Sequence, residues 1–322
     1  MSPDWQNIIL ETPSPAEAWT RIFAALLDLA ASALTPRELH AATVTPDRLL
    51  AEAAWDLWFA YPEAAERTST RLKNWAAQPV GNAGGRAVLV LDALSLRDLP
   101  ILLKAAEARD IAAAEVRVTG AECPTTTEAF ARALGLPSRA ALADDAKPAN
   151  FSLFGAGAAC RTDALNLPFA DCPVPSVPNL LIWHSWLDDL IHLQKQPDQL
   201  ARATASALQD DGFWSFVNRL RQGRKLVVTS DHGYAVAKHF STEMTDPEAV
   251  EALRGTFGAS RCKAAAAPWQ RRFMPPVVMS FGNHHIVMGQ RKWKAPGGFP
   301  ELCHGGMSLL EAAVPWIELE AL

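Results

Sequence analysis

The chain has 322 residues, of which 49% are hydrophobic and 20% are charged, and its formal net charge is −5. This composition is typical of a globular protein with a sizeable core, and the length allows one large α/β domain or two smaller ones. An acidic balance gives no overall field that would draw the protein onto nucleic acid. No apolar run approaches the ~20 residues of a membrane helix, so we expect no membrane span.

The cysteines and the first residues of the chain indicate the cellular compartment. The five cysteines are odd in number, widely spaced and without a CxxC pair. The first residues lack the basic and apolar regions of a signal peptide. Both features favour a reduced, cytoplasmic protein over a disulfide scaffold.

Residues 1–80 carry helix signals and no strand signal. Ser14 to Glu17 and Thr35 to Glu38 are both capping boxes with proline at the first helical position. Thr45-Pro46-Asp47 resembles a third helix start, and apolar residues recur at helical spacing. We therefore expect a helical N-terminal segment at 1–80, followed by a catalytic domain at 81–322.

Beyond residue 80, short apolar runs alternate with helical stretches. We expect strands at 87–91, 115–118, 179–183, 225–229, 276–281 and 285–288, and helices at 96–107, 127–134 and 246–253. Apolar runs spaced by helices predict an α/β fold whose central sheet is mostly parallel, with helices on both faces. Residues 147–178 and 241–272 are expected to be excursions from the sheet, and Ser308 is expected to cap a final helix.

Polar side chains follow the expected strands. Asp92 comes directly after 87–91, and Asp188 lies just beyond 179–183. Asp231 and His232 follow 225–229. Ligands of open α/β sheets bind at the carboxyl ends of the strands, and an unpaired buried charge is costly. We therefore expect these side chains to meet at one edge of the sheet.

Aspartate and histidine together suit Zn²⁺, with Mn²⁺ as an alternative. Asp188 and His192 are four residues apart, so on a helical turn both would face the same way. Asp231 and His232 are adjacent and need a sharp backbone turn, which Gly233 would permit. The candidate ligands of a two-metal site are Asp92, Asp188, His192, Asp231, His232 and His304.

Taken singly, each of these residues also fits an ordinary structural role. Asp92 or Thr127 could cap a helix, because aspartate and threonine are both common at that position. Asp188 with His192 could be a solvated pair on a helix surface. The joint occurrence of all of them favours metal ligands.

Five segments resemble the alkaline phosphatase superfamily, and within it the PglZ domain of bacterial phage-defence (BREX-type) systems. They are LVLDALSLRDL, CPTTTEAFARALGLPSR, WHSWLDDLIHL, VVTSDHGY and HGGMSLLEAAVPWI. They occur in the family order from about Ala87 to the C-terminus. The DHG after a strand and the final HGG-x-S-x-x-E are the most specific of them.

The resemblance implies an alkaline-phosphatase-like fold and a role for each motif residue. Thr127 would be the nucleophile, with Thr126 as the fallback. One divalent ion would be held by Asp92, Asp231, His232 and the nucleophile, and the other by Asp188, His192 and His304. Asp189, next to Asp188, is a competing ligand.

The implied activity is hydrolysis of phosphate esters, either monoesters or diesters, through a phosphothreonine. Nucleotide or nucleic-acid-derived esters are one option for the substrate, and phage-defence proteins are candidate partners. Two departures bear on this: Ile191 stands where many members have glycine, and Glu128-Ala129-Phe130 replaces a Pro-Asn-His stretch. The alternatives are a catalytically weak assembly module of a phage-defence complex, and a mutase or other phosphoryl transferase.

Overall fold

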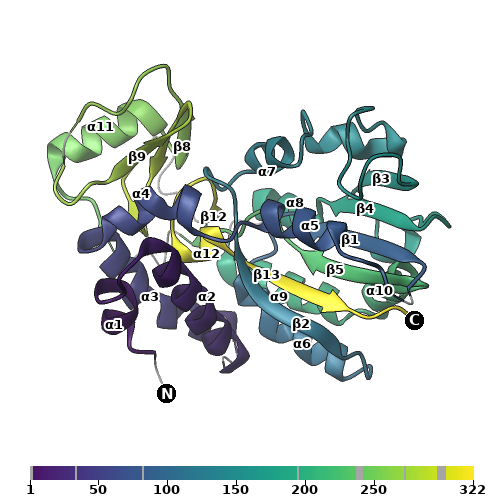
Figure 1. Ribbon diagram of the computed structural model, residues 1–322. Coiled ribbons are helices and arrows are strands. Elements are labelled where there is room, and N and C mark those ends of the chain that lie inside the picture. The colour runs from purple at the N-terminus through teal and green to yellow at the C-terminus, as the bar shows by residue number, and fades with distance from the viewer. Residues whose placement is uncertain are drawn as a thin grey trace.

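The computed structural model describes residues 3–32, 35–81, 83–193, 196–236, 242–271, 273–295 and 302–322. A six-stranded sheet in the order β2-β13-β5-β1-β4-β3 forms its centre (Figure 1). Its strands are β1 (Gly85–Leu91), β2 (Ala113–Gly120), β3 (Cys160–Leu165), β4 (Asn179–His184), β5 (Arg224–Thr229) and β13 (Ala313–Leu319). Strands β3, β4, β1 and β5 run parallel, whereas β13 is antiparallel to β5 and β2. The predicted α/β fold with a mostly parallel sheet is confirmed.

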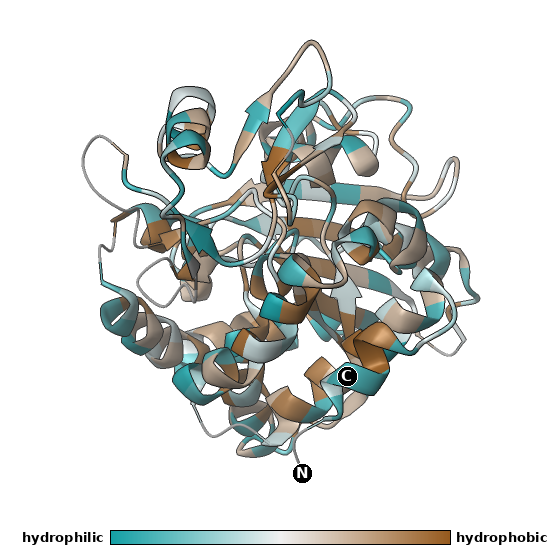
Figure 2. Cartoon of the chain, turned by 90° about the vertical axis from the view of Figure 1, so that its left-hand side faces the viewer, coloured by the Kyte–Doolittle hydropathy of each residue, from teal (hydrophilic) through white to brown (hydrophobic). Residues whose placement is uncertain are grey.

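Helices cover both faces of this sheet. Successive side chains of a strand point to opposite faces, and in β1 Leu89 belongs to one core cluster whereas Val88 and Val90 belong to another. The face of Val88 packs against α5 (Thr68–Ala77) and α7 (Thr127–Ala133). The opposite face packs against α6 (Leu99–Glu107), α8 (Trp186–Leu193), α9 (Pro197–Gln209) and α10 (Asp211–Arg221). Figure 2 shows hydrophobic residues on strands of the sheet and on the helices that cover it.

The first eighty residues are helical, as predicted, in α1 (Trp5–Leu10), α2 (Pro15–Ser32), α3 (Pro36–Glu52), α4 (Trp55–Ala64) and α5. The rings of Trp19 and Tyr61 pack edge to face at 4.9 Å, and Tyr61 donates to the carbonyl of Ala121 at 2.8 Å. Helices α1 to α4 share one apolar core with one face of the sheet, and α5 packs on the opposite face. The boundary near residue 80 stays a prediction. None of the helices in the described residues is long and apolar enough to span a membrane.

One helix start was wrong: Thr45-Pro46-Asp47 lies inside α3. A proline in a helix removes one N–H donor, but the surrounding packing overrides that loss. Pro46 is buried, and Asp47 is fully buried where it accepts hydrogen bonds from distant groups. Tertiary contacts therefore keep the helix continuous.

A small lobe stands at one end of the sheet (Figure 1). It contains α11 (Pro247–Phe257) and an antiparallel sheet of β8 (Cys262–Ala264), β10 (His284–Val287) and β9 (Val278–Phe281). It has its own apolar cluster, built around Leu253, Phe257 and Trp293. Two separate two-stranded sheets pair β6 (Ala235–Val236) with β12 (Leu302–Cys303), and β7 (Thr242–Glu243) with β11 (Arg291–Lys292).

Two strands of the central sheet, β3 and β13, lie where the sequence predicted none, and so do the short strands β6, β7, β8, β11 and β12. Strand β3 lies inside the excursion predicted at 147–178, and so does the 3₁₀ turn η3 (Phe169–Asp171). The 3₁₀ turn η2 (Arg139–Asp145) comes just before that excursion, and η1 (Leu96–Asp98) precedes α6. The final helix α12 (Leu309–Ala312) is a single turn, and the chain continues as β13 between β2 and β5. Because β13 is paired on both sides and almost fully buried, long-range pairing decides its conformation.

Candidate metal centre

The ends of β1 and β5 deliver the first group of polar side chains. The two strands are parallel neighbours, so Asp92 and Asp231 leave the sheet side by side. The backbone N–H of Ala93 donates to Oδ1 of Asp231 at 3.0 Å, and Ala93 itself has a φ of 64°. A β-carbon on Gly233 would lie 2.2 Å from the carbonyl oxygen of Leu310. Close approach of this backbone therefore requires the glycine of the Asp-His-Gly motif.

Asp92, Asp231 and His232 form a buried trio with candidate ligand atoms close together. Nε2 of His232 lies 3.3 Å from Oδ2 of Asp231 and 3.8 Å from Oδ1 of Asp92. Nδ1 of His232 lies 2.9 Å from the carbonyl oxygen of Gly233. Because a carbonyl only accepts, Nδ1 donates to it, and Nε2 is the ring atom that faces the carboxylates. Such a hydrogen bond orients metal-binding histidines.

Thr127 lies at this trio. It begins α7, and its hydroxyl oxygen is 3.3 Å from Oδ1 of Asp92 and 3.3 Å from Nε2 of His232. The neighbouring Thr126 is the helix N-cap, and its hydroxyl accepts the backbone N–H of Ala129. Of the two threonines, the structure thus brings Thr127 to the carboxylates and gives Thr126 a capping function.

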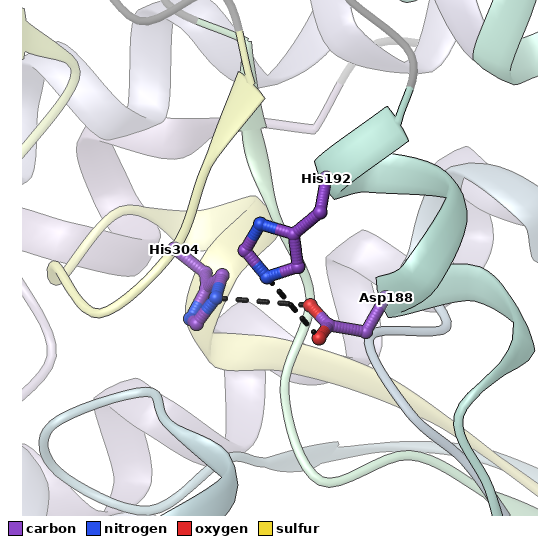
Figure 3. A group of neighbouring side chains, drawn as sticks. All are labelled: Asp188, His192 and His304. Atoms are coloured by element: carbon purple, nitrogen blue, oxygen red, sulfur yellow. Dashed lines mark ion pairs between the residues drawn. The ribbon is translucent and has the colours of Figure 1, made fainter.

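Asp188, His192 and His304 form a second trio (Figure 3). Asp188 and His192 lie one turn apart on α8, and Nε2 of His192 is 3.3 Å from Oδ2 of Asp188. His304 reaches them from the loop after β12, with Nε2 at 3.7 Å from Oδ1 of Asp188. Asp189 is turned away and accepts a hydrogen bond from the Ser185 hydroxyl at 2.5 Å.

The two trios are neighbours. The rings of His232 and His304 stack with centroids 4.4 Å apart and an interplanar angle of 14°. All six predicted ligands, which span more than two hundred residues of sequence, therefore belong to one connected site.

Electrostatics in the free protein favour a cation here. Burial and the Asp231 charge raise the pKa of Asp92 well above its usual range, and burial raises the pKa of Asp231 to about 6. Burial and the neighbouring His232 lower the pKa of His304 to about 4. Crowded carboxylates resist ionisation unless positive charge lies between them, and a neutral imidazole is the form that binds metals.

Two carboxylate oxygens support the fit of metal ions to these trios. Oδ2 of Asp231 and Oδ1 of Asp188 are buried and have no hydrogen-bond donor among the residues that the structure describes. Leaving a buried acceptor without a partner is costly. One such oxygen lies in each trio, and the Asp and His donors suit Zn²⁺ or Mn²⁺.

Sequence reasoning missed Arg139. It lies at the start of η2, and its Nη1 donates to Oδ2 of Asp92 at 2.7 Å. Its side chain is 31% exposed, so it faces both the trio and solvent. It is the last residue of the segment CPTTTEAFARALGLPSR, twelve residues after Thr127, but the resemblance gave it no role.

The loop that carries His304 is held by a buried ion pair. Arg261 and Glu311 are joined by two hydrogen bonds of 2.9 Å, and both are almost fully buried. Glu311 also accepts the N–H of Gly306 at 3.0 Å and the hydroxyl of Ser308 at 2.7 Å. Glu311 is the glutamate of the HGG-x-S-x-x-E motif, whereas no motif contained Arg261.

Thr125 ties the same loop to the segment before Thr127. Its hydroxyl accepts the N–H of Gly305 at 2.9 Å and donates to the carbonyl of Gly306 at 2.9 Å. Its own carbonyl oxygen lies 3.4 Å from Nδ1 of His304. The positions of His304 and Thr127 are therefore coupled through one short stretch of chain.

No protein-family model matches the chain, and no curated protein matches it. Among solved structures, it is similar to phosphonoacetate hydrolase from Sinorhizobium meliloti 1021 in complex with phosphonoacetate, at 13% identity over 76% of this chain and 91% of that one, with a TM-score of 0.40. Murine ectonucleotide pyrophosphatase/phosphodiesterase 5 has 13% identity over 73% and 88%, with a TM-score of 0.41. The alkaline phosphatase PafA has 12% identity over 46% and 41%, with a TM-score of 0.28. These are partial similarities in the path of the backbone, and they assign no substrate and no residue role to this chain.

Proposed function

We propose that this protein is a metal-dependent hydrolase of phosphate esters, with Thr127 as its nucleophile and two divalent cations, zinc in preference to manganese. One observation carries the proposal: the Thr127 hydroxyl lies 3.3 Å from both Asp92 and His232, in a trio that is stacked against a second one. A hydroxyl beside two clusters of metal-ligand side chains suits nucleophilic attack on phosphorus.

The first ion would be held by Asp92, Asp231 and His232, and the second by Asp188, His192 and His304. Bound there, the ions would lower the pKa of the nucleophilic hydroxyl and withdraw charge from the phosphoryl oxygens.

The chain's own residues supply the other parts of the reaction. In the free protein the hydroxyl of Thr127 donates to Oδ1 of Asp92 at 3.3 Å, so Asp92 would accept the hydroxyl proton, while Nε2 of His232 is kept for the ion because Nδ1 donates to the carbonyl of Gly233. The Thr127 oxygen bonds to phosphorus, and the bond between phosphorus and the leaving alcohol oxygen breaks. Water then attacks the phosphothreonine, releases phosphate or a phosphomonoester and regenerates the hydroxyl.

The motif resemblance extends the proposal to a PglZ-type enzyme that acts in the cytoplasm in phage defence. Nucleotide or nucleic-acid-derived esters are the corresponding substrate class, and defence proteins are the corresponding partners. Phage infection of cells carrying the wild-type or the Thr127→Ala protein tests this extension. Equal plaque counts in a strain that the wild type protects would separate defence from catalysis.

Hydrolysis of p-nitrophenyl phosphate and bis-p-nitrophenyl phosphate with Zn²⁺, Mn²⁺ or Mg²⁺ tests the activity. Thr127→Ala should lower the rate by ~10³-fold or more, as expected for a nucleophile. Thr126→Ala is the matched control, because it removes a cap worth ~1 kcal/mol of stability and should keep the activity. A Thr127→Ala rate within tenfold of wild type would remove Thr127 from this role.

Metal titration of chelator-treated protein tests the two trios. The wild type should bind two equivalents of Zn²⁺, and Asp188→Asn should bind one. Asp189→Asn is the control, because Asp189 hydrogen-bonds to Ser185 outside the trio, and it should keep two. The opposite result for the two variants would move the ligand to Asp189, and failure of the wild type to bind metal would refute the hydrolase.

A further inference from the structure

A second polar cavity lies away from the metal centre. It has a volume of about 830 Å³ and lies between α5, the C-terminal end of α7 and the loop at 150–155. We name it the basic groove. Arg86, at the amino end of β1, lines it, whereas Asp92 follows the carboxyl end of the same strand. A strand rises ~3.3 Å per residue, so about 20 Å separates the groove from the metal trio.

The charged side chains of the groove all have the same sign. Lys73, Arg86 and Arg132 line it, and no aspartate or glutamate is among its lining residues in the described parts of the chain. This contrasts with the net charge of −5 for the whole protein. The groove therefore concentrates positive potential on an otherwise acidic molecule.

Arg86 is the most informative of the three. It is only 6% exposed, yet its guanidinium has no hydrogen bond or ion pair within the described ranges, and it lies 5.5 Å over the ring of Trp75. Burial lowers the pKa of Arg86, and the charge of Glu318 opposes this, although Glu318 pairs with Lys225 at 3.8 Å. No nitrogen of the Arg86 guanidinium is among the buried polar atoms that lack a partner, so its N–H groups reach the open groove, where an anionic ligand would supply an acceptor.

The negative end of α7 also faces the groove, but its charge is partly offset. Lys73 donates to the carbonyl of Ala133 in the last turn of the helix at 2.7 Å. A cation at a helix C-terminus neutralises the carbonyl dipoles there. Arg132 is exposed on the same turn and has no ion pair among the described residues, so it faces the groove uncommitted.

The groove also offers aromatic surface. Phe151 and Phe154 pack with one side on the core beneath α7 and line the groove with the other. Asn150 and Ser152 add hydrogen-bonding groups between them. Cations interleaved with aromatic rings and amides are the combination that holds phosphates while bases stack. The volume lies within the 300–1,000 Å³ range of ligand pockets.

We propose that the basic groove binds nucleotides through their phosphates and bases, either free or within a single strand of nucleic acid, at a site separate from the metal centre. The phosphate pairs with Arg86 and Arg132, and a base stacks on Phe151. The proposal does not depend on the hydrolase activity, because no bond is made or broken at the groove.

Fluorescence anisotropy with a labelled eight-nucleotide single strand tests the proposal, and unlabelled 5′-AMP as competitor distinguishes a free nucleotide from a strand. Thr127→Ala protein serves as the host, so that hydrolysis does not consume the probe. With three cations, the logarithm of the affinity should fall with the logarithm of salt concentration at a slope of about −2. Arg132→Glu should weaken binding at low salt by roughly tenfold or more and flatten that slope. Phe151→Leu, which keeps the apolar contact, should weaken binding by roughly 5- to 150-fold.

Two further variants separate binding from folding. Arg86→Met should abolish binding without lowering the melting temperature of the free protein, because it removes a guanidinium that lacks an acceptor and keeps an aliphatic side chain over Trp75. Lys104→Glu is the charge control, because Lys104 is exposed on α6, on the opposite face of the sheet. It should leave the affinity within about twofold of the host protein. Equal weakening by Lys104→Glu and Arg132→Glu, absence of binding, or a strong preference for polyphosphate over the oligonucleotide would overturn the proposal.

Discussion

Replacing Glu311 by glutamine should cost both stability and metal affinity. The Glu311 carboxylate accepts four hydrogen bonds of 2.7–3.0 Å, two of them from Arg261, and it is 0% exposed. Glutamine has one acceptor oxygen in place of two, and its NH₂ group would point at groups that are themselves hydrogen-bond donors. Arg261 would then carry a buried charge without its counterion, and breaking such a pair costs about 3–5 kcal/mol.

Urea and thermal unfolding of chelator-treated protein measure the loss of stability. A loss of that size should lower the melting temperature by roughly 5–15 °C. The matched control is Glu251→Gln on α11 of the small lobe, where Glu251 pairs with Arg254 and both side chains are exposed. An exposed pair contributes at most about 1 kcal/mol, so this variant should unfold close to wild type.

Metal binding distinguishes a positioning role for Glu311 from a merely structural one. Glu311 accepts the N–H of Gly306, two residues after His304, so the loop that carries His304 should shift when glutamine replaces Glu311. We expect the second zinc equivalent to weaken more than the first, at a temperature where the variant is fully folded. The reasoning would be refuted by a destabilisation below about 1 kcal/mol, or by two zinc affinities that fall equally.

Two other predictions concern charged groups at and near the site. Arg139 pairs with Asp92, so it would compete with a cation for that carboxylate, and Arg139→Ala should tighten metal binding. The same variant should lower kcat/KM for phosphate monoesters by roughly tenfold or more, because a charged hydrogen bond to the phosphoryl group is lost. Weaker metal binding, measured by titration, would contradict this prediction. Burial raises the pKa of Asp47 from 3.8 to about 7. The folded state therefore keeps the Asp47 proton up to about pH 7, whereas the unfolded state loses it near pH 4. The stability that this proton contributes is full below about pH 4 and is lost as the pH rises to about 7. Chelated wild-type protein should gain stability relative to Asp47→Asn between pH 8 and pH 5 in urea unfolding, and a constant difference would count against it.

The relation between strand ends and polar residues was predictable because it is local. Asp92 and Asp231 each follow an apolar run, and the direction of parallel strands fixes the edge at which they emerge. The spacing of Asp188 and His192 likewise needs only the geometry of one helix. The sequence therefore predicted which residues would meet, before any contact between them was known.

What could not be predicted depends on contacts across the chain. Strand β13 reads locally as the continuation of a helix that Ser308 caps, and only pairing with β2 and β5 explains why it is extended. Arg139 and Arg261 are ordinary arginines in sequence, and each becomes significant through a carboxylate 47 or 50 residues away. Periodicity carries no signal for such pairs.

The N-terminal helices also contribute to the geometry of the candidate metal centre. Asp47 of α3 accepts the N–H of Leu309 at 3.0 Å and the side-chain amide of Gln290 at 2.7 Å. Leu309 begins the turn that carries Glu311, and Gln290 lies in the small lobe beside Gly289, whose carbonyl accepts from Arg261. A buried carboxylate on the third helix thus holds two of the segments that position His304. A chain without its first eighty residues would leave both donors buried and unpaired, so the helices contribute to the site as well as to the core.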